Sequence, residues 1–188
     1  MSSENKPEPA AYMSRALSLA EELVKSLALK KETVAAAESC TAGLASDFIA
    51  RIPGASNVFW GSFVSYTPDA KVRMLGVPEE LIEKYGAVSR PVALAMAEGA
   101  LKKSGAFWAF SVTGVAGPGG DGGIPAGTVW IGLASVIAPA TAGREGEGSL
   151  WSEAKEFLFR GSRNEVREAA ALAALQELLE RVLTRSPC

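Results

Sequence analysis

Apolar and polar positions follow a helical period in two long segments of the chain. Near the start, an apolar residue recurs at every third or fourth position, at Tyr12, Ala16, Leu19, Leu23 and Leu27. The same spacing returns near the end, at Leu172, Leu175, Leu179 and Val182. Because side chains at this spacing share one face of a helix, the pattern predicts amphipathic helices over residues 11–28 and around residues 172–182.

Shorter stretches with a different pattern predict strands. Residues 33–38, 58–66, 106–113 and 128–136 are apolar or rich in β-branched and aromatic side chains. Residues 151–160 alternate large side chains with smaller ones, which is typical of an outer strand. Turn and capping residues predict four helices between the strands. The first ends at residue 52, and the others cover residues 67–75, 78–85 and 89–105.

Strands and helices alternate early in the chain, and later the strands follow one another. This order predicts an α/β protein, a three-layer α/β/α fold with a mixed, mostly parallel sheet. Residues 1–10 are polar and contain proline, which predicts a disordered tail before a single domain over residues 11–185. We predict that residues 138–148 form a flexible connection between two strands.

Composition and charge exclude several classes of function. The formal net charge of the 188 residues is −2, without a stripe of lysine and arginine, so we expect no nucleic-acid partner. The absence of histidine and the presence of two cysteines exclude Ser-His and Cys-His catalytic pairs and the common zinc sites. Since the sequence has no signal core and no apolar run of membrane-spanning length, we expect a cytoplasmic protein without a membrane partner.

Two motifs match enzyme signatures but lack the structural context that those signatures need. Residues 117–122 match the GxGxxG of dinucleotide-binding proteins, yet a strand rather than a helix is predicted to follow them. Ser152 and Lys155 match an SxxK motif, yet residues three apart on a strand point to opposite faces. We therefore reject both interpretations.

The first candidate site is the turn after the strand over residues 33–38. Residues 38–43 (Glu-Ser-Cys-Thr-Ala-Gly) place a hydroxyl where a strand passes into a helix, beside small residues that let a ligand approach. Backbone N–H groups at such a junction can hold an anion or a developing oxyanion. The alternative is that Ser39 or Thr41 only caps the helix and that Cys40 fills the core.

Lys71 is the second candidate, because it falls in the first turn of the helix predicted over residues 67–75. The helix dipole disfavours a cation there, and this position together with burial lowers the pKa of a lysine. A neutral amine can take a proton from a serine, and without histidine this is one of few routes to an activated hydroxyl. The alternative is a solvent-exposed lysine paired with Asp69.

A glycine-rich stretch is the third candidate. Residues 112–120 (Val-Thr-Gly-Val-Ala-Gly-Pro-Gly-Gly) lie at the end of the strand predicted over residues 106–113. Backbone of this kind can wrap a phosphate or let N–H groups converge on a ligand. The alternative is a flexible hairpin connection, and glycine permits both.

Taken in order along the chain, these motifs resemble the CinA C-terminal domain family. The resemblance covers residues 17–183. It rests on Ala-Glu-Ser-Cys-Thr at 37–41, Phe-Val-Ser-Tyr at 63–66 followed by Lys71, Leu-Gly-Val-Pro at 75–78, Gly-Ala-Val-Ser at 86–89, Thr-Gly-Val-Ala-Gly-Pro-Gly at 113–119 and Gly-Thr-Val at 127–129.

The resemblance implies hydrolysis of nicotinamide mononucleotide (NMN) to nicotinic acid mononucleotide and ammonia, without a metal or organic cofactor and usually by a homo-oligomer. Ser39 matches the family nucleophile, Lys71 its general base and Tyr66 a hydroxyl that assists proton transfer. Thr113 matches an active-site threonine. We expect substrate contacts from Thr41, Gly43, Gly114, Ala116, Gly117, Gly119 and Arg163, with the last of these as a phosphate donor.

The chain departs from the usual family sequence at two places. Ala42 replaces a glycine, and the sequence leaves open whether its added methyl group narrows the approach of the substrate. Thr67 and Pro68 replace Ser-Asn and still form a sound helix start. Two further hypotheses stay open, a catalytically silent nucleotide-binding module and an amidase acting on another small amide, and Cys40 is the rival nucleophile.

Overall fold

The computed structural model describes residues 9–137 and 149–185. The first eight residues of the tail predicted over residues 1–10 and the predicted connection over residues 138–148 lie outside the described residues. The first helix begins at Pro9, so residues 9 and 10 belong to a helix rather than to the tail in which we expected them.

Helices and strands occur in the predicted order. The helices are α1 (Pro9–Lys30), α2 (Leu44–Ala50), α3 (Pro68–Ala70), α4 (Glu79–Tyr85), α5 (Arg90–Ser104) and α6 (Arg163–Thr184), with a short 3₁₀ helix η1 (Ala55–Asn57) and a π-helical turn η2 (Lys71–Leu75) that continues α3. The strands are β1 (Val34–Glu38), β2 (Phe59–Val64), β3 (Trp108–Gly114), β4 (Thr128–Ile137) and β5 (Ser149–Leu158). Each strand boundary lies within two residues of its prediction.

The strands of the described residues form one mixed sheet in the order β2-β1-β3-β4-β5. β1 is parallel to β2 and β3, whereas β4 is antiparallel to both β3 and β5. β4 therefore runs against the other four strands, which confirms the mixed and mostly parallel sheet. β5 lies at one edge, as its alternating pattern indicated.

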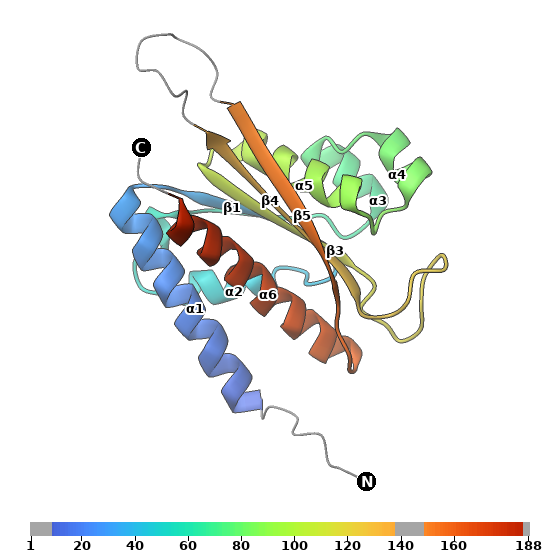
Figure 1. The fold of residues 1–188 in the computed structure, drawn as a ribbon, viewed down its shortest axis with the longest axis horizontal. Helices are drawn as coiled ribbons and strands as arrows, with labels where there is room; N and C mark the ends of the chain where they lie inside the picture. The colour runs from blue at the N-terminus through green and yellow to red at the C-terminus, as the bar shows by residue number, and fades with distance from the viewer. Residues whose placement is uncertain (1–8, 138–148, 186–188) are drawn as a thin grey trace.

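Helices cover both faces of this sheet (Figure 1). Helices α1, α2 and α6 lie on one face, and α3, α4 and α5 lie on the other. Along β3, Trp108, Phe110 and Val112 pack into the core beneath α1, α2 and α6, while Ala109 packs with α5. Burial on both faces explains why β3 is an almost continuous apolar run, and the arrangement confirms the three-layer fold.

The carboxyl ends of three parallel strands meet at one edge of the sheet. Glu38, the last residue of β1, pairs with Val64 of β2 and Val112 of β3. Ligands of α/β proteins bind outside the carboxyl ends of such strands. All three candidate segments of the sequence follow these strand ends, so the fold brings them together.

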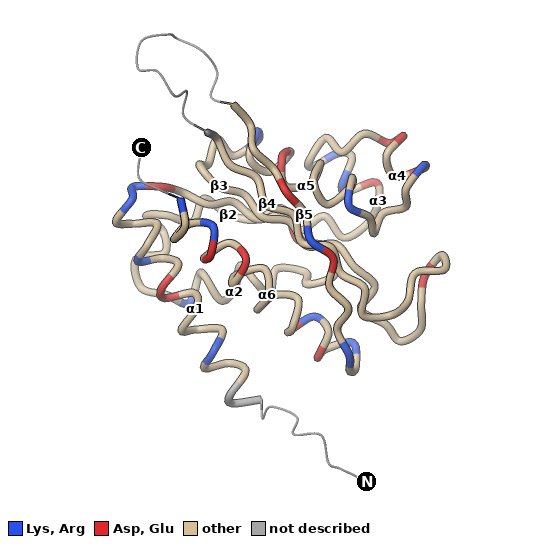
Figure 2. Tube along the Cα trace, viewed as in Figure 1, with Lys and Arg blue, Asp and Glu red and all other residues tan. Residues whose placement is uncertain are grey.

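Charged residues are spread over the molecule without separation by sign. Figure 2 shows Lys and Arg intermixed with Asp and Glu along the described helices, so no extended field of one sign builds up there. Among the residues that the structure describes, no helix combines the length and the apolar character that crossing a membrane requires.

Candidate active site

A pocket of about 340 Å³ opens at this edge of the sheet. This volume lies at the lower end of the roughly 300–1,000 Å³ that is usual for small-ligand sites. The lining comes from the turn after β1, the segment after β2, the loop before α5, the glycine-rich loop and the start of α6. It consists of Ser39, Cys40, Tyr66, Pro68, Lys71, Ala87, Val88, Thr113, residues 114–121 and Arg163.

Ser39 begins the turn directly after β1. Its backbone N–H donates to the Val112 carbonyl at 2.9 Å, which extends the pairing of β1 with β3. Its Oγ donates to the Tyr66 carbonyl at 3.3 Å. Gly43 occupies the N-cap position of α2 without a side-chain cap, so Ser39 does not serve as the cap of this helix. The hydroxyl therefore lies in the pocket lining on backbone that is hydrogen-bonded to the sheet.

Lys71 is only 1% exposed. Its Nζ donates to the Ser65 carbonyl at 3.1 Å, the neighbour of the carbonyl that Ser39 contacts. Burial lowers the pKa of Lys71 from 10.5 to about 8, because the charged amine loses hydration in the interior. The alternative of an exposed lysine paired with Asp69 is wrong, since Asp69 forms its ion pair with Arg73 at 2.7 Å.

Cys40 also lines the pocket and is buried. Burial raises the pKa of the Cys40 thiol to about 11, and the positive charge of Lys71 only partly offsets this effect. A thiol with this pKa forms little thiolate at neutral pH. Cys40 is therefore a weaker candidate nucleophile than Ser39.

Arg163, the first residue of α6, links two walls of the pocket. One terminal nitrogen of its guanidinium donates to the Gly117 carbonyl at 2.8 Å, and the other donates to the Tyr66 hydroxyl. A capping box formed by Ser162 and Glu165 fixes the start of this helix. Arg163 and Tyr66 are both exposed, so a ligand in the pocket can reach them.

Thr113 connects the pocket to the loop before α5, to which the sequence analysis gave no role. Its hydroxyl donates to the Ala87 carbonyl at 2.9 Å, and Ala87 and Val88 line the pocket. The motif Gly-Ala-Val-Ser at 86–89 was the available signal. Its contact with Thr113 joins residues 26 positions apart and could not be derived from spacing.

The glycine-rich loop is held by its own backbone. The Val115 N–H donates to the Thr128 carbonyl at 2.9 Å, and Asp121 and Ile124 exchange two hydrogen bonds near the tip. Gly114 leaves no space for a side chain, because a Cβ there would lie 2.7 Å from the Thr128 carbonyl oxygen. Asp121 lines the pocket as well, and the sequence analysis missed it.

Glu38 anchors the turn that carries Ser39, a role that the sequence analysis also missed. Its carboxylate is fully buried and accepts the backbone N–H groups of Gly43, Ala45 and Ser46 at 3.0, 3.1 and 2.9 Å, as well as the Ser46 hydroxyl. These N–H groups at the start of α2 have no partner within the helix. The carboxylate therefore ties the turn to both β1 and α2.

Thr41 and Gly43, two expected substrate contacts, are not in the pocket lining. The Gly43 N–H is bonded to Glu38, and Thr41 is fully buried with its carbonyl accepting from Arg167 at 3.0 Å. Ala42 lies outside the lining and is exposed. Its methyl group therefore does not line the pocket.

Both rejected motifs have the structure that the rejection assumed. Residues 117–122 are followed by β4 and not by a helix. Ser152 donates to Glu98 of α5 on one face of the sheet, and Lys155 donates to Glu177 of α6 on the other. Within the described ranges, no group of three His, Cys, Asp or Glu side chains is placed to hold a metal ion.

The fold and the pocket define a class, the three-layer α/β proteins with a ligand site at the carboxyl ends of their parallel strands, here equipped with a serine and a buried amine. Within this class, the chain belongs to the CinA C-terminal domain family, which matches residues 16–182.

Curated relatives fall into a short and a long group. The nicotinamide-nucleotide amidohydrolase PncC of Shigella flexneri is 41% identical over 90% of this chain and 96% of its own length. A competence-damage inducible protein of Symbiobacterium thermophilum is 49% identical over 79% of this chain but only 34% of its own. A CinA-like protein of Chlorobaculum tepidum is 42% identical over 91% of this chain and 39% of its own. This chain therefore spans well under half of the longer relatives.

Solved structures of the family agree with the fold. A competence damage-inducible protein from Klebsiella pneumoniae has a TM-score of 0.81 at 28% identity, covering 91% of this chain and 99% of its own. A competence/damage inducible protein from Agrobacterium tumefaciens has a TM-score of 0.76 at 36% identity, covering 88% of this chain and 94% of its own.

Proposed function

We propose that this protein hydrolyses the carboxamide of NMN to nicotinic acid mononucleotide and ammonia through a Ser-Lys acyl-enzyme mechanism. One observation carries the proposal: the pocket holds the Ser39 hydroxyl together with a buried amine, Lys71, whose pKa is about 8. Such an amine can accept a proton near neutral pH. The amidohydrolase name of the Shigella flexneri relative supports the choice of substrate.

In the acylation half, Ser39 Oγ attacks the carboxamide carbon while neutral Lys71 takes the hydroxyl proton, directly or through Tyr66. The tetrahedral intermediate needs N–H donors for its oxyanion. The Ser39 N–H is already bonded to Val112, so the donor is a neighbouring N–H in the turn or at Gly114. When the C–N bond breaks, the leaving nitrogen takes the proton from Lys71 and departs as ammonia.

In the deacylation half, Lys71 is neutral again and removes a proton from a water molecule. The water oxygen attacks the ester carbon, the bond to Ser39 Oγ breaks, and Lys71 returns the proton to this oxygen. The products are the free Ser39 hydroxyl and the carboxylic acid of nicotinic acid mononucleotide, which releases its proton to solvent and becomes the carboxylate. No group besides Lys71 is needed as base and acid in this scheme.

The phosphate of the substrate needs donors in the pocket. Arg163 is exposed in the pocket lining, and it contacts the glycine-rich loop through Gly117. Backbone N–H groups of a glycine-rich loop bind phosphate oxygens in many proteins. We propose Arg163, Gly114, Ala116, Gly117 and Gly119 as the phosphate and ribose contacts.

The test is ammonia release from NMN by the purified protein in the presence of EDTA. We expect metal-independent release that falls by about 10⁴-fold or more in Ser39→Ala, because a catalytic nucleophile is removed. Cys40→Ala is the matched control next to it in the chain, and it should retain most of the activity.

Each other outcome overturns a defined part of the proposal. Activity that survives in Ser39→Ala but is lost in Cys40→Ala would reassign the nucleophile. Calorimetric binding of NMN without ammonia release would favour a catalytically silent nucleotide-binding module. Faster turnover of another small amide in a parallel panel would reassign the substrate.

We also propose that the protein is a cytoplasmic homo-oligomer. Strand β2 lies at a sheet edge, with Trp60 53% and Val64 43% exposed, and it lacks the charged side chains that usually protect an edge. The buried free thiol of Cys40 is typical of a reducing compartment. A monomer mass by light scattering would contradict the oligomer, and cell fractionation tests the compartment.

A further inference from the structure

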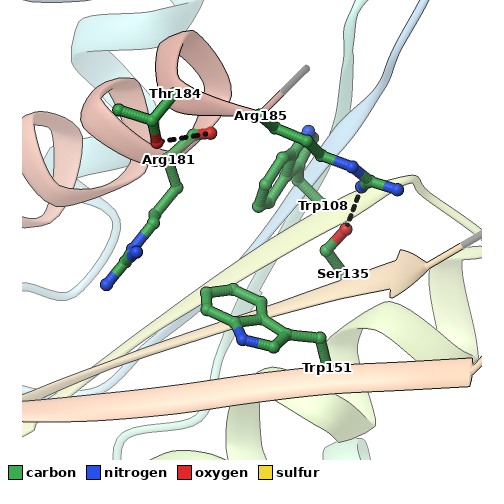
Figure 3. Close-up of a pocket in the computed structure, with 6 residues that line it drawn as sticks. All are labelled: Trp108, Ser135, Trp151, Arg181, Thr184 and Arg185. Atoms are coloured by element: carbon green, nitrogen blue, oxygen red, sulfur yellow. Dashed lines mark hydrogen bonds between the residues drawn. The ribbon is translucent and has the colours of Figure 1, made fainter. Parts of the chain in front are cut away.

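A second pocket, of about 320 Å³, lies at the opposite end of the sheet from Ser39. It is lined by Trp108, Ser135, Trp151, Arg181, Thr184 and Arg185 (Figure 3). Strand β3 reaches both sites, since its first residue, Trp108, lines this pocket and Thr113 lines the other. At about 3.3 Å per residue, Trp108 and Thr113 are about 17 Å apart along the strand, so the two pockets are separate sites.

Aromatic rings and guanidinium groups make up most of its walls. The indoles of Trp108 and Trp151 form a corner, with centroids 6.3 Å apart and planes at 83°. Arg181 and Arg185 project from the end of α6 toward these rings (Figure 3). The Arg181 guanidinium lies 5.5 Å from the Trp151 centroid, and that of Arg185 lies 5.6 Å from the Trp108 centroid. A flat aromatic ring fits the chemistry of this corner.

The two arginines differ in how their charge is compensated. Arg181 forms a two-point ion pair with the Glu153 carboxylate, at 2.5 and 2.7 Å. Arg185 donates instead to two neutral acceptors, the Ser135 hydroxyl at 2.7 Å and the Val136 carbonyl at 2.9 Å. In the described part of the chain no carboxylate pairs with Arg185. Its charge and its remaining N–H donors are thus available to an anion.

The charges of the other groups near the pocket cancel, so Arg185 determines the sign of its net charge. Lys30 donates to the Arg185 carbonyl at 2.9 Å, and Glu32 accepts the indole N–H of Trp108 at 2.7 Å. One cation and one anion offset each other. The bond to Glu32 also satisfies the Trp108 N–H, so this indole offers its apolar surface to a ligand.

We propose that this pocket binds a planar aromatic carboxylate, whose ring packs against Trp108 and Trp151 and whose carboxylate pairs with Arg185. The planar fork of a guanidinium matches the two oxygens of a carboxylate. Ser135, which is 1% exposed, already holds this guanidinium in place, so little side-chain entropy is lost on binding. The carboxamide of the same ring lacks the charge and binds more weakly.

The test uses the indole N–H signals of ¹⁵N-labelled protein, because the chain contains four tryptophans. Nicotinate should shift the signals of Trp108 and Trp151 and leave those of Trp60 and Trp130 in place. Nicotinamide, the uncharged ligand with the same ring, should need about tenfold higher concentration for the same shift, which is the usual value of one charge-assisted hydrogen bond.

Variants of Arg185 test whether its charge causes the preference for nicotinate over nicotinamide. Arg185→Gln should weaken nicotinate binding by about tenfold and leave nicotinamide binding unchanged. Arg51→Gln, at the exposed end of α2, is the matched control and should change neither. Should Arg185→Gln fail to fold, Ser135→Ala provides the second variant, because it removes the hydroxyl that holds the guanidinium and should also weaken nicotinate binding.

Three results would overturn the proposal. The first is an equal affinity for nicotinate and nicotinamide. The second is a set of shifts confined to Trp60 or Trp130, which do not line the pocket. The third is an unchanged affinity for nicotinate in folded Arg185→Gln or in Ser135→Ala. None of these readouts depends on turnover of NMN, so the proposed function is tested separately.

Discussion

The protonation of Lys71 sets the expected pH dependence of catalysis. Burial lowers its pKa to about 8, and only the neutral amine can accept the proton of Ser39. Below this pKa, kcat/KM for NMN should rise about tenfold per pH unit, and above it the rate should level off. Initial rates measured between about pH 6 and 9 test this, and a rate that falls steadily over this range would exclude Lys71 as the base.

The backbone conformation of Ala42 lowers the stability of the protein. Its φ of 52° places it in the left-handed region, where a Cβ costs roughly 1–2 kcal/mol. Ala42→Gly removes this strain. Glycine also raises the conformational entropy of the unfolded chain, which offsets part of the gain in stability. We expect the free energy of unfolding to rise by about 0.5–1 kcal/mol, with KM for NMN unchanged, because Ala42 lies outside the pocket lining.

Urea denaturation measures this difference, and Ala28→Gly is the matched control. Ala28 is exposed and lies within α1, so glycine there should lower the free energy of unfolding by about 0.5–1 kcal/mol. A loss of stability in both variants would contradict the strain argument.

At the scale of elements, the turn between β1 and α2 depends on one buried carboxylate. Glu38→Gln keeps the shape of the side chain but replaces one acceptor oxygen with an NH₂ group that faces N–H donors. At least one buried N–H then loses its partner, which costs about 1–3 kcal/mol of stability. The turn also loses its fixed position, and displacement of a nucleophile by about 1 Å can cost up to 100-fold in rate.

We therefore expect Glu38→Gln to lower kcat by about tenfold or more with little change in KM, since Glu38 does not line the pocket. Steady-state kinetics separate the two constants, and Asp47→Asn on the exposed side of α2 is the control. Lower stability with an unchanged kcat would limit Glu38 to a structural role. A change in KM alone would contradict the prediction that Glu38 positions Ser39.

The elements themselves could be predicted from the sequence because each carries its own periodicity. Strand β3 is apolar throughout since both of its faces are buried, and α1 repeats apolar residues toward one core. Element ends were less certain, as the start of α1 at Pro9 shows. The role of Glu38 could not be predicted, because it depends on the path of the turn through Ala42 in the left-handed region.

The two pockets of the molecule differ in how far the sequence could reveal them. The pocket around Ser39 follows the ends of three parallel strands, and each segment carried a motif of its own. The pocket around Arg185 joins Trp108 to the end of α6 and has no local motif. Only the packing of α6 across the sheet brings its aromatic and cationic groups together, so spacing along the chain gave no signal.

The charge of the chain determines whether it can bind DNA. Relatives and structural neighbours carry names that refer to competence and damage, yet this chain has a net charge of −2 and basic residues intermixed with acidic ones (Figure 2). Binding to a DNA duplex is driven by lysine and arginine side chains that displace counterions from phosphates, and non-specific binders reach dissociation constants of about 10⁻⁴–10⁻⁶ M at physiological salt.

We therefore expect no change in the fluorescence anisotropy of a labelled duplex at protein concentrations up to about 10⁻⁵ M, even at low salt, where counterion release favours binding most. A basic DNA-binding protein measured on the same duplex is the positive control. Binding that weakens as salt is added would show that a local cluster of cations outweighs the net charge.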